Sequence, residues 1–146
     1  MVDYAMRAAM ELATAHPGMV KAETIAERQQ LPLAFTKKIL NKMQHAGLVT
    51  ARRGGDGGYR LTKEPGTISV ADVIRAVEGP LADVRGEAPE TLDYPGASEV
   101  LRTLWIATRA SVRAVLEHVT LADLADGALP DLVVGLTDQA GAWHRR

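Results

Sequence analysis

Apolar and polar positions follow a helical period along most of this chain and switch to a strand period once. Apolar residues three and four positions apart predict amphipathic helices, and these cover residues 3–16, 21–30, 34–47, 69–79, 98–119 and 121–127. Between the third and fourth helices, alternation on both sides of the glycine-rich stretch 54–58 predicts a hairpin of strands 48–53 and 58–62. The expected fold class is mainly α with one small two-stranded β-wing.

Local signals at the helix ends agree with these boundaries. Pro17 and Gly18 end the first helix, and Pro32 separates the second from the third. Ser69 and Thr120 are candidate N-caps. The inward faces predicted from the spacing comprise Tyr4, Ala5, Ala8, Met10, Leu12 and Ala13 in the first helix, Ala22, Ile25 and Ala26 in the second, and Phe35, Ile39, Leu40 and Met43 in the third.

The order helix, short helix, turn, helix and hairpin is typical of a winged helix-turn-helix unit. In such a unit the second helix of the pair enters the DNA major groove, and the hairpin follows the backbone or the minor groove. Arg52 and Arg53 stand beside the glycine-rich tip, where the lack of side chains lets the backbone approach a sugar–phosphate chain. A nucleotide-binding phosphate loop is disfavoured, because no Gly-Lys-Ser/Thr follows and the strand–loop–helix order is missing. A plain hairpin turn leaves the flanking arginines unexplained.

These placements give a set of candidate DNA contacts. The first turn of the third helix supplies base readout, and Lys42 further along supplies a phosphate contact. Phe35 is either a core residue or a wedge between bases, and the stripe it shares with Ile39 favours the core. The predicted set comprises Thr24, Ala34, Phe35, Thr36, Lys37, Lys38 and Lys42 from the helices, and Arg52, Arg53, Gly54, Gly55, Asp56, Gly57 and Tyr59 from the wing.

Charge is divided unequally between the two halves of the chain. Residues 1–64 carry ten lysines and arginines against six acids, whereas residues 65–146 carry seven against twelve. This asymmetry indicates that a polyanion, here double-stranded DNA, faces the first half.

Other function classes lack their chemistry in this sequence. There is no cysteine, so disulfides, zinc–thiolate sites and cysteine-held iron–sulfur clusters are excluded. The four histidines are not spaced as metal ligands, and no nucleophile–base pair or nucleotide fingerprint points to an enzyme. No apolar run reaches the ~18 residues of a membrane span. A cytoplasmic, nucleoid-associated protein is therefore expected.

Four segments together resemble one family of regulators. "DYAMRAAMELA", "TIAERQQLPLAFTKKILNKMQHAGLV", "RRGGDGGYRL" and "ISVADVIRAVEG" are similar, in order and spacing, to the Rrf-type winged-helix transcriptional regulators, the family of IscR, NsrR and CymR. The glycine-rich wing after the helix-turn-helix is the specific part of the match. The resemblance implies a homodimeric bacterial transcription factor, here expected to be a repressor, whose two wings flank an inverted-repeat operator.

The helix predicted over residues 98–119 would be ~33 Å long, more than so small a domain needs for its own core. Its apolar stripe is therefore expected to pack against a second copy, and the resemblance implies the same. We predict a DNA-binding domain over residues 1–79, a loop over 80–97, and a dimerisation helix with a tail over 98–146. The predicted dimer interface comprises Leu101, Leu104, Trp105, Thr108, Val112, Val115, Leu116 and Val119.

The sequence departs from the family in the loop before the long helix. Sensing members carry three cysteines there, whereas residues 80–97 have none. Asp3 matches the position of a non-cysteine cluster ligand in the family. Because a single carboxylate cannot hold a cluster, Asp3 is expected instead to cap the first helix. No cofactor is expected; an organic effector near Trp105, or no effector at all, stays open. A winged-helix module that binds only proteins, and an effector-binding protein with weak DNA affinity, are the alternative functions.

Overall fold

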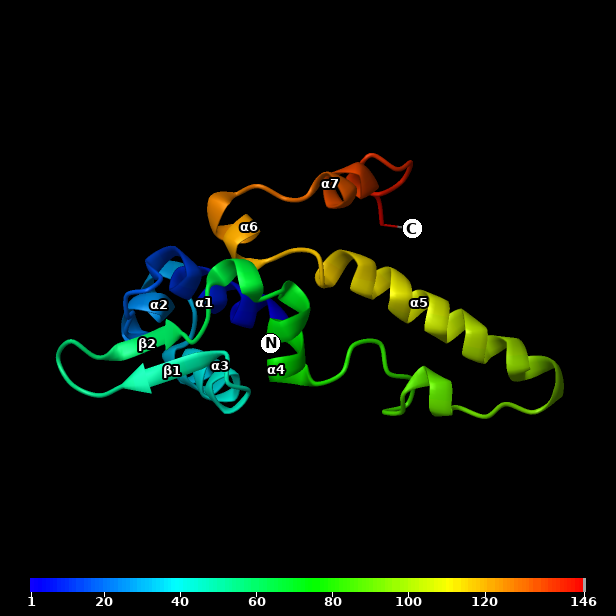
Figure 1. Ribbon diagram of the computed structural model, residues 1–146, viewed down its shortest axis with the longest axis horizontal. Coiled ribbons are helices and arrows are strands. Elements are labelled where there is room, and N and C mark those ends of the chain that lie inside the picture. The colour runs from blue at the N-terminus through cyan, green and yellow to red at the C-terminus, as the bar shows by residue number, and fades with distance from the viewer. Residues whose placement is uncertain (146) are drawn as a thin grey trace.

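The computed structural model describes residues 1–145, and one small hairpin projects from an edge of its helical part (Figure 1). Three short 3-10 turns, Pro65–Thr67, Pro89–Thr91 and Gly96–Glu99, connect the longer elements. These are α1 (Val2–Ala15), α2 (Ala22–Gln29), α3 (Leu33–His45), β1 (Val49–Arg52), β2 (Gly58–Leu61), α4 (Val70–Glu78), α5 (Val100–Leu116), α6 (Leu121–Asp126) and α7 (Asp131–Thr137). The mainly helical fold with a two-stranded antiparallel sheet confirms the predicted fold class.

The hydrophobic core lies where α1, α2, α3 and α4 meet the base of the hairpin. Alanines on the inner side of α1 let its neighbours approach closely, and larger aliphatic side chains fill the remaining space. The fully buried large residues include Leu12, Ile25, Ile39, Leu40, Met43, Val49, Ile68, Val73 and Leu121. This core holds the helix-turn-helix and the base of the wing as one unit.

The wing is joined to the α1–α2 connection by a backbone bridge. Val20 N–H donates to Tyr59 O over 2.9 Å, and Tyr59 N–H donates to Val20 O over 2.8 Å. Gly58, at φ 139°, lies so close to Val20 that a Cβ atom would stand 2.6 Å from the Val20 carbonyl oxygen. A Cβ on Gly57 would stand 2.2 Å from the Arg52 carbonyl oxygen. Internal packing therefore requires these two glycines, whereas Gly54 and Gly55 at the tip face open space.

Two helix starts carry the caps expected from the sequence. Ser69 and Asp72 form a reciprocal capping box at α4, and Thr120 and Asp123 form another at α6. The cap predicted for Asp3 is wrong. Because α1 already begins at Val2, Asp3 lies in its first turn, where its carboxylate accepts a hydrogen bond from Arg7 at 3.4 Å.

The chain returns to the core after the long helix. Val119 is buried, its carbonyl accepts the Val70 N–H over 2.8 Å, and Leu121 N–H donates to Ile68 O over 2.9 Å. The segment 98–146 is thus not wholly separate from the first domain. The predicted helix is also shorter than expected, because its first residues form a 3-10 turn and its last residues leave the helix to enter the core. Helix α7 was not predicted.

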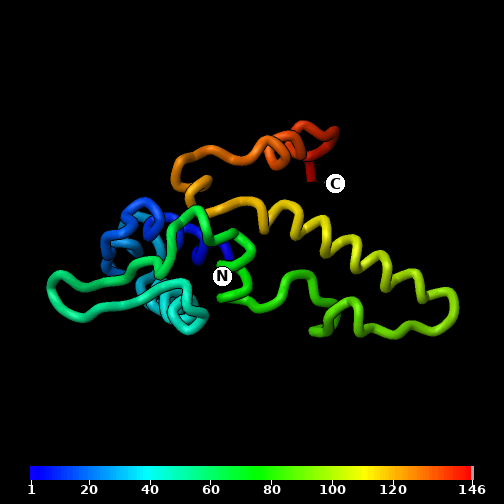
Figure 2. Tube along the Cα trace, in the orientation of Figure 1, coloured from blue at the N-terminus to red at the C-terminus, as the bar shows by residue number. Residues whose placement is uncertain are grey.

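The segment 80–97 runs away from the core, and helix α5 returns alongside it (Figure 2). None of the seventeen residues of α5 is buried. Among residues 1–145, no helix is both long and apolar enough to cross a membrane.

Candidate nucleic-acid interface

Helix α3 presents one side to the core and the opposite side to solvent. Its buried residues are Thr36, Ile39, Leu40 and Met43. Phe35 is 45% exposed, so its predicted place in the core stripe is wrong. Thr36 is fully buried and its hydroxyl donates to Pro32 O over 3.2 Å, so the prediction that Thr36 contacts bases is wrong as well. The other three predicted inward residues, Ile39, Leu40 and Met43, are buried as expected, so the error is confined to the first turn of the helix.

The exposed start of α3 combines an aromatic ring with two lysines. The Phe35 ring packs edge-on against Tyr4 at 6.2 Å between centroids, and Lys38 Nζ lies 5.9 Å from the Phe35 ring centre. Lys37 pairs with Glu23 of α2 at 2.8 Å. The hydrogen bond from Lys37 lowers the pKa of Glu23 below its ordinary value, and the same bond raises the pKa of Lys37. Ala34, Phe35, Lys37 and Lys38 thus share the solvent face.

Lys42 does not share that face. Its ammonium group donates to the Val77 carbonyl oxygen over 2.7 Å, close to the C-terminal end of α4. A cation is favourable at a helix C-terminus, where carbonyl groups lack intrahelical partners. The prediction that Lys42 contacts phosphate is therefore wrong in this structure. Lys42 instead ties the recognition helix to α4.

The wing carries two arginines beside a small, exposed tip. Arg52 and Arg53 are exposed, and among residues 1–145 neither lies within ion-pair distance of a carboxylate. Asp56 at the tip is exposed too. Tyr59 is half-buried against the core. The wing surface is therefore made mostly by the arginines and the tip.

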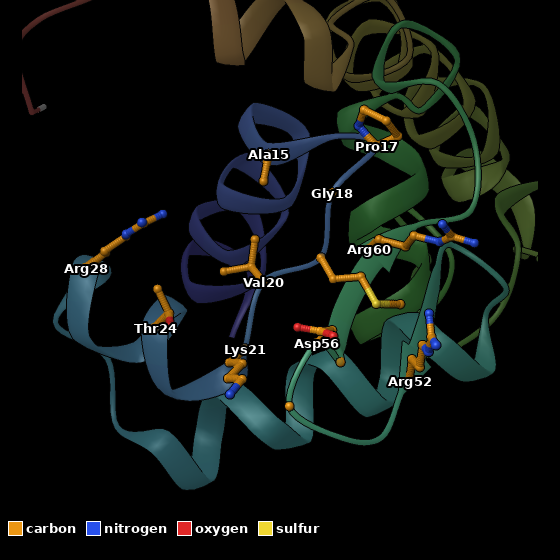
Figure 3. Close-up of a pocket in the computed structure, with 13 residues that line it drawn as sticks. Ala15, Pro17, Gly18, Val20, Lys21, Thr24, Arg28, Arg52, Asp56 and Arg60 are labelled. Carbon is orange, nitrogen blue, oxygen red and sulfur yellow. The ribbon is translucent and has the colours of Figure 1, made fainter.

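A hollow of about 640 Å³ separates the wing from α2 (Figure 3). Thr24, Arg52, Gly55, Asp56 and Gly57 of the predicted set line it. Three further cations, Lys21, Arg28 and Arg60, line it as well, and sequence reasoning missed them. Arg60 could have been found, since strand alternation places it on the same side of the hairpin as Arg52. No local signal brings Arg28 to the wing.

The predicted dimer stripe of α5 divides into two sides. Leu101 and Trp105 are half-buried, and the Trp105 indole N–H donates to the Tyr94 hydroxyl over 3.0 Å. Leu104 is 51% exposed and Thr108 is also exposed. Val119 is no part of this helix and lies in the core, so its place in the predicted interface is wrong. Val112, Val115 and Leu116 are half-buried.

Several direct contacts hold the segment 80–97 against α5. Arg102 Nε donates to Leu92 O over 2.7 Å, and Arg109 pairs with Glu90 at 2.6 Å. The side chain of Arg109 is 12% exposed, and its hydrogen bond lowers the pKa of Glu90. The place expected for an effector near Trp105 is therefore closed on one side by Tyr94.

Comparison with known proteins gives one consistent relationship. A family model described as Rrf2, iron-dependent transcriptional regulator, matches residues 1–127. The chain is 47% identical over 138 residues to the HTH-type transcriptional regulator Rv1287 of Mycobacterium tuberculosis, covering 93% of this chain and 85% of that protein. It is 36% identical over 123 residues to the HTH-type transcriptional regulator CymR of Bacillus subtilis, covering 84% of each.

Solved structures show the same relationship. The structure of CymR, the global cysteine regulator of B. subtilis, superposes with a TM-score of 0.73 at 33% identity, covering 87% of this chain and 94% of that chain. The structure of T. potens IscR superposes with a TM-score of 0.69 at 32% identity, covering 86% of this chain and 83% of that chain.

Proposed function

The chain belongs to the Rrf2 family of transcriptional regulators, and from that premise we propose that it acts as a homodimeric repressor on an inverted-repeat DNA operator. The observation that carries this proposal is a set of exposed, unpaired cations on α3 and the wing within residues 1–145. Lys38 on α3 and Arg52 and Arg53 on the wing have no carboxylate partner among residues 1–145. Such cations gain most from a polyanion, because binding releases the counterions of DNA.

Each part of the surface would contribute a different kind of contact. Ala34, Phe35 and Lys38 lie at the exposed start of α3, where recognition helices touch base edges. Phe35 offers an apolar surface to a thymine methyl group, and Lys38 can donate to guanine. Arg53 on the wing would enter the minor groove, where narrow A·T-rich stretches attract arginine. Lys37, already paired with Glu23, would contribute less.

A second copy of the chain would cover the exposed side of α5. Helix α5 has no buried residue and thus has apolar surface left to cover, and large exposed apolar patches normally mark an interface. Leu104, Thr108, Ser111 and Val115 lie three and four positions apart on one side of the helix. Two copies packed there about a two-fold axis would place two recognition helices on a symmetric operator.

The iron named in the family description does not fit the residues of this chain. The sequence has no cysteine, and no group of three histidines, aspartates or glutamates that could hold a metal lies among residues 1–145. Cluster binding requires thiolates for most or all of its ligands. We therefore propose that this regulator works without an iron–sulfur cluster.

Selection from a random duplex library, followed by fluorescence anisotropy, tests the proposal. We expect an enriched palindrome bound by two chains, with an affinity that falls steeply as salt rises. An enriched single half-site bound by one chain would contradict the dimer. No enrichment, with capture of a protein partner instead, would favour the protein-binding alternative. Anaerobic purification supplies a separate check, since stoichiometric iron with a charge-transfer spectrum would contradict the cluster-free proposal.

A further inference from the structure

The hollow between the wing and α2 has the size of a small-molecule site. Its volume of about 640 Å³ falls within the range of roughly 300–1,000 Å³ that is usual for ligand sites. Three segments form it: the α1–α2 connection with Gly18 and Lys21, helix α2 with Thr24, and the wing with Gly57. The bridge between Val20 and Tyr59 fixes the connection against the wing.

Positive charge dominates the lining of this hollow. Lys21, Arg28, Arg52 and Arg60 contribute four cations, and Asp56 contributes the single carboxylate. Figure 3 shows Arg28 on one side and Arg52 with Arg60 on the other, with Asp56 between the two sides. Arg28 pairs with Glu11 at 3.3 Å, whereas the other three cations have no ion-pair partner within residues 1–145.

The hollow is distinct from the surface of the recognition helix. No residue of α3 is among those that line it, and its far end is formed by Ala15 and Pro17 at the end of α1. In Figure 3, α3 lies below the hollow, on the side of Lys21, and Ala15 and Pro17 lie at the opposite end. A duplex seated on α3 would therefore reach the wing tip without having to fill the hollow.

We propose that this hollow binds a free, phosphate-bearing small molecule. Arginine and lysine donors on two walls suit a group with several anionic oxygens, because charge-assisted hydrogen bonds to phosphate are short and strong. The backbone at Gly55 and Gly57 lets such a group approach closely, since neither residue places a side chain in the hollow. A ligand held by both Lys21, the N-cap of α2, and Arg60 would add a second link between the α1–α2 connection and the wing, next to the Val20–Tyr59 bridge.

Such a link would change DNA affinity only if the wing position of the ligand-bound form differed from that of the free form. This consequence rests on the proposed function, whereas binding of the anion itself does not. The two can therefore be measured separately. DNA phosphate is the other source of the same chemistry, and the experiment must distinguish it.

Isothermal titration of the full-length protein with pyrophosphate, in low-chloride buffer and without DNA, tests the site. We expect one pyrophosphate per chain. Arg60→Gln should weaken the affinity about tenfold, the loss of one near-surface charge contact. Asp56→Asn should tighten it, because it removes the one repelling carboxylate. Lys63→Gln is the matched control, because Lys63 is also exposed and unpaired within residues 1–145 but lies outside the hollow. This variant should bind pyrophosphate with the affinity of the wild type.

Three results would overturn the inference. The first is the absence of saturable pyrophosphate binding. The second is an equal loss in Lys63→Gln and Arg60→Gln, which would mean that net charge alone attracts the anion. The third appears with a duplex: if DNA displaces pyrophosphate, and Arg60→Gln lowers the salt slope of DNA binding by about one unit, the hollow seats the DNA backbone. A protein that binds pyrophosphate in the expected way but no DNA would leave the site standing and contradict only the proposed function.

Discussion

The cations of this chain are used differently in its two halves. In residues 65–145, Arg75, Arg102, Arg109 and Arg113 each pair with a carboxylate of the same half. In residues 1–64, most cations on α3 and the wing have no such partner among the described residues. The first arrangement joins structural elements to one another, and the second leaves charge available to a polyanion. Net charge, which is −1 for the whole chain, hides this difference.

The burial of apolar side chains also differs between the helix-turn-helix and the helices that follow it. The helix-turn-helix has a dense aliphatic core, whereas α5 and α7 have no buried residue at all. The core beneath the available charge is closed, and α4 and Leu121 of the second half help to complete it, whereas α5 and α7 have apolar surface to cover. Three of the predictions below test whether one region binds DNA and the other binds a second copy, and the fourth tests an ion pair within the second half.

The largest effect is expected from Leu104→Asp. Leu104 is exposed in the single chain, so the carboxylate should leave the monomer folded and disrupt only the contact with a second copy. Loss of the second half-site contact should weaken operator binding by about 100-fold or more, because avidity is lost. Sedimentation velocity and anisotropy measure the two effects, and circular dichroism checks the fold. Ala110→Asp, on an exposed position on a different side of α5, is the control, and an Ala110→Asp monomer would show that the interface lies elsewhere.

The next largest effect is expected from Arg53→Ala on the wing. If Arg53 reads the minor groove, its removal should weaken binding to the operator by about 1–3 kcal/mol at matched salt. Lys63→Ala removes an exposed charge away from the wing tip and should change affinity far less. Equal operator affinity of the wild type and Arg53→Ala would remove the wing from the proposed interface.

Lys42 and Lys38 separate the two uses of charge within a single helix. Because Lys42 donates to Val77 O, Lys42→Met should lower the free energy of unfolding by about 1–3 kcal/mol, the cost of losing a charged hydrogen bond. Lys38→Met should leave stability unchanged and lower the salt slope of DNA binding by about one unit. Urea denaturation and salt titrations measure both. The reverse pattern would mean that Lys42 faces DNA in solution.

Sequence reasoning predicted the elements whose signals are local. The capping residues Ser69 and Thr120, the hairpin around residues 54–58 and the helix ending near Pro17 all appear where expected. The inward residue of the first turn of α3 was harder to predict, because both Phe35 and Thr36 lie three or four positions before Ile39. Thr36 is buried at little cost since its hydroxyl bonds to its own helix, a feature that periodicity does not reveal.

The remaining errors come from contacts between distant segments. The bond from Lys42 to Val77 depends on how α3 crosses α4, and the return of Val119 to the core depends on α1 and α4. Gly57 and Gly58 looked like a flexible tip in the sequence, yet backbone atoms of Arg52 and Val20 leave no room there for a side chain. Helix α7 is short and contains Gly135, so its spacing alone gave no helical signal.

The smallest effect concerns the ion pair between Glu90 and Arg109. Its hydrogen bond lowers the pKa of Glu90 below the ordinary 4.5. When the pKa of a carboxyl group is lower in the folded state than in the unfolded state, the ionised carboxylate stabilises the folded state. This stabilisation is complete at pH values above the unfolded-state pKa, and it is lost as the pH falls through the folded-state pKa. Glu90→Gln should therefore lower the Tm slightly at pH 7, and the difference from the wild type should vanish in acid.

Glu87→Gln, which removes an exposed glutamate without an ion-pair partner among residues 1–145, should show no such pH-dependent difference. If Glu90→Gln and the wild type have the same Tm at pH 7, the ion pair does not stabilise the loop against α5. The remaining hydrogen bonds from Arg102 and Trp105 then suffice to hold the loop.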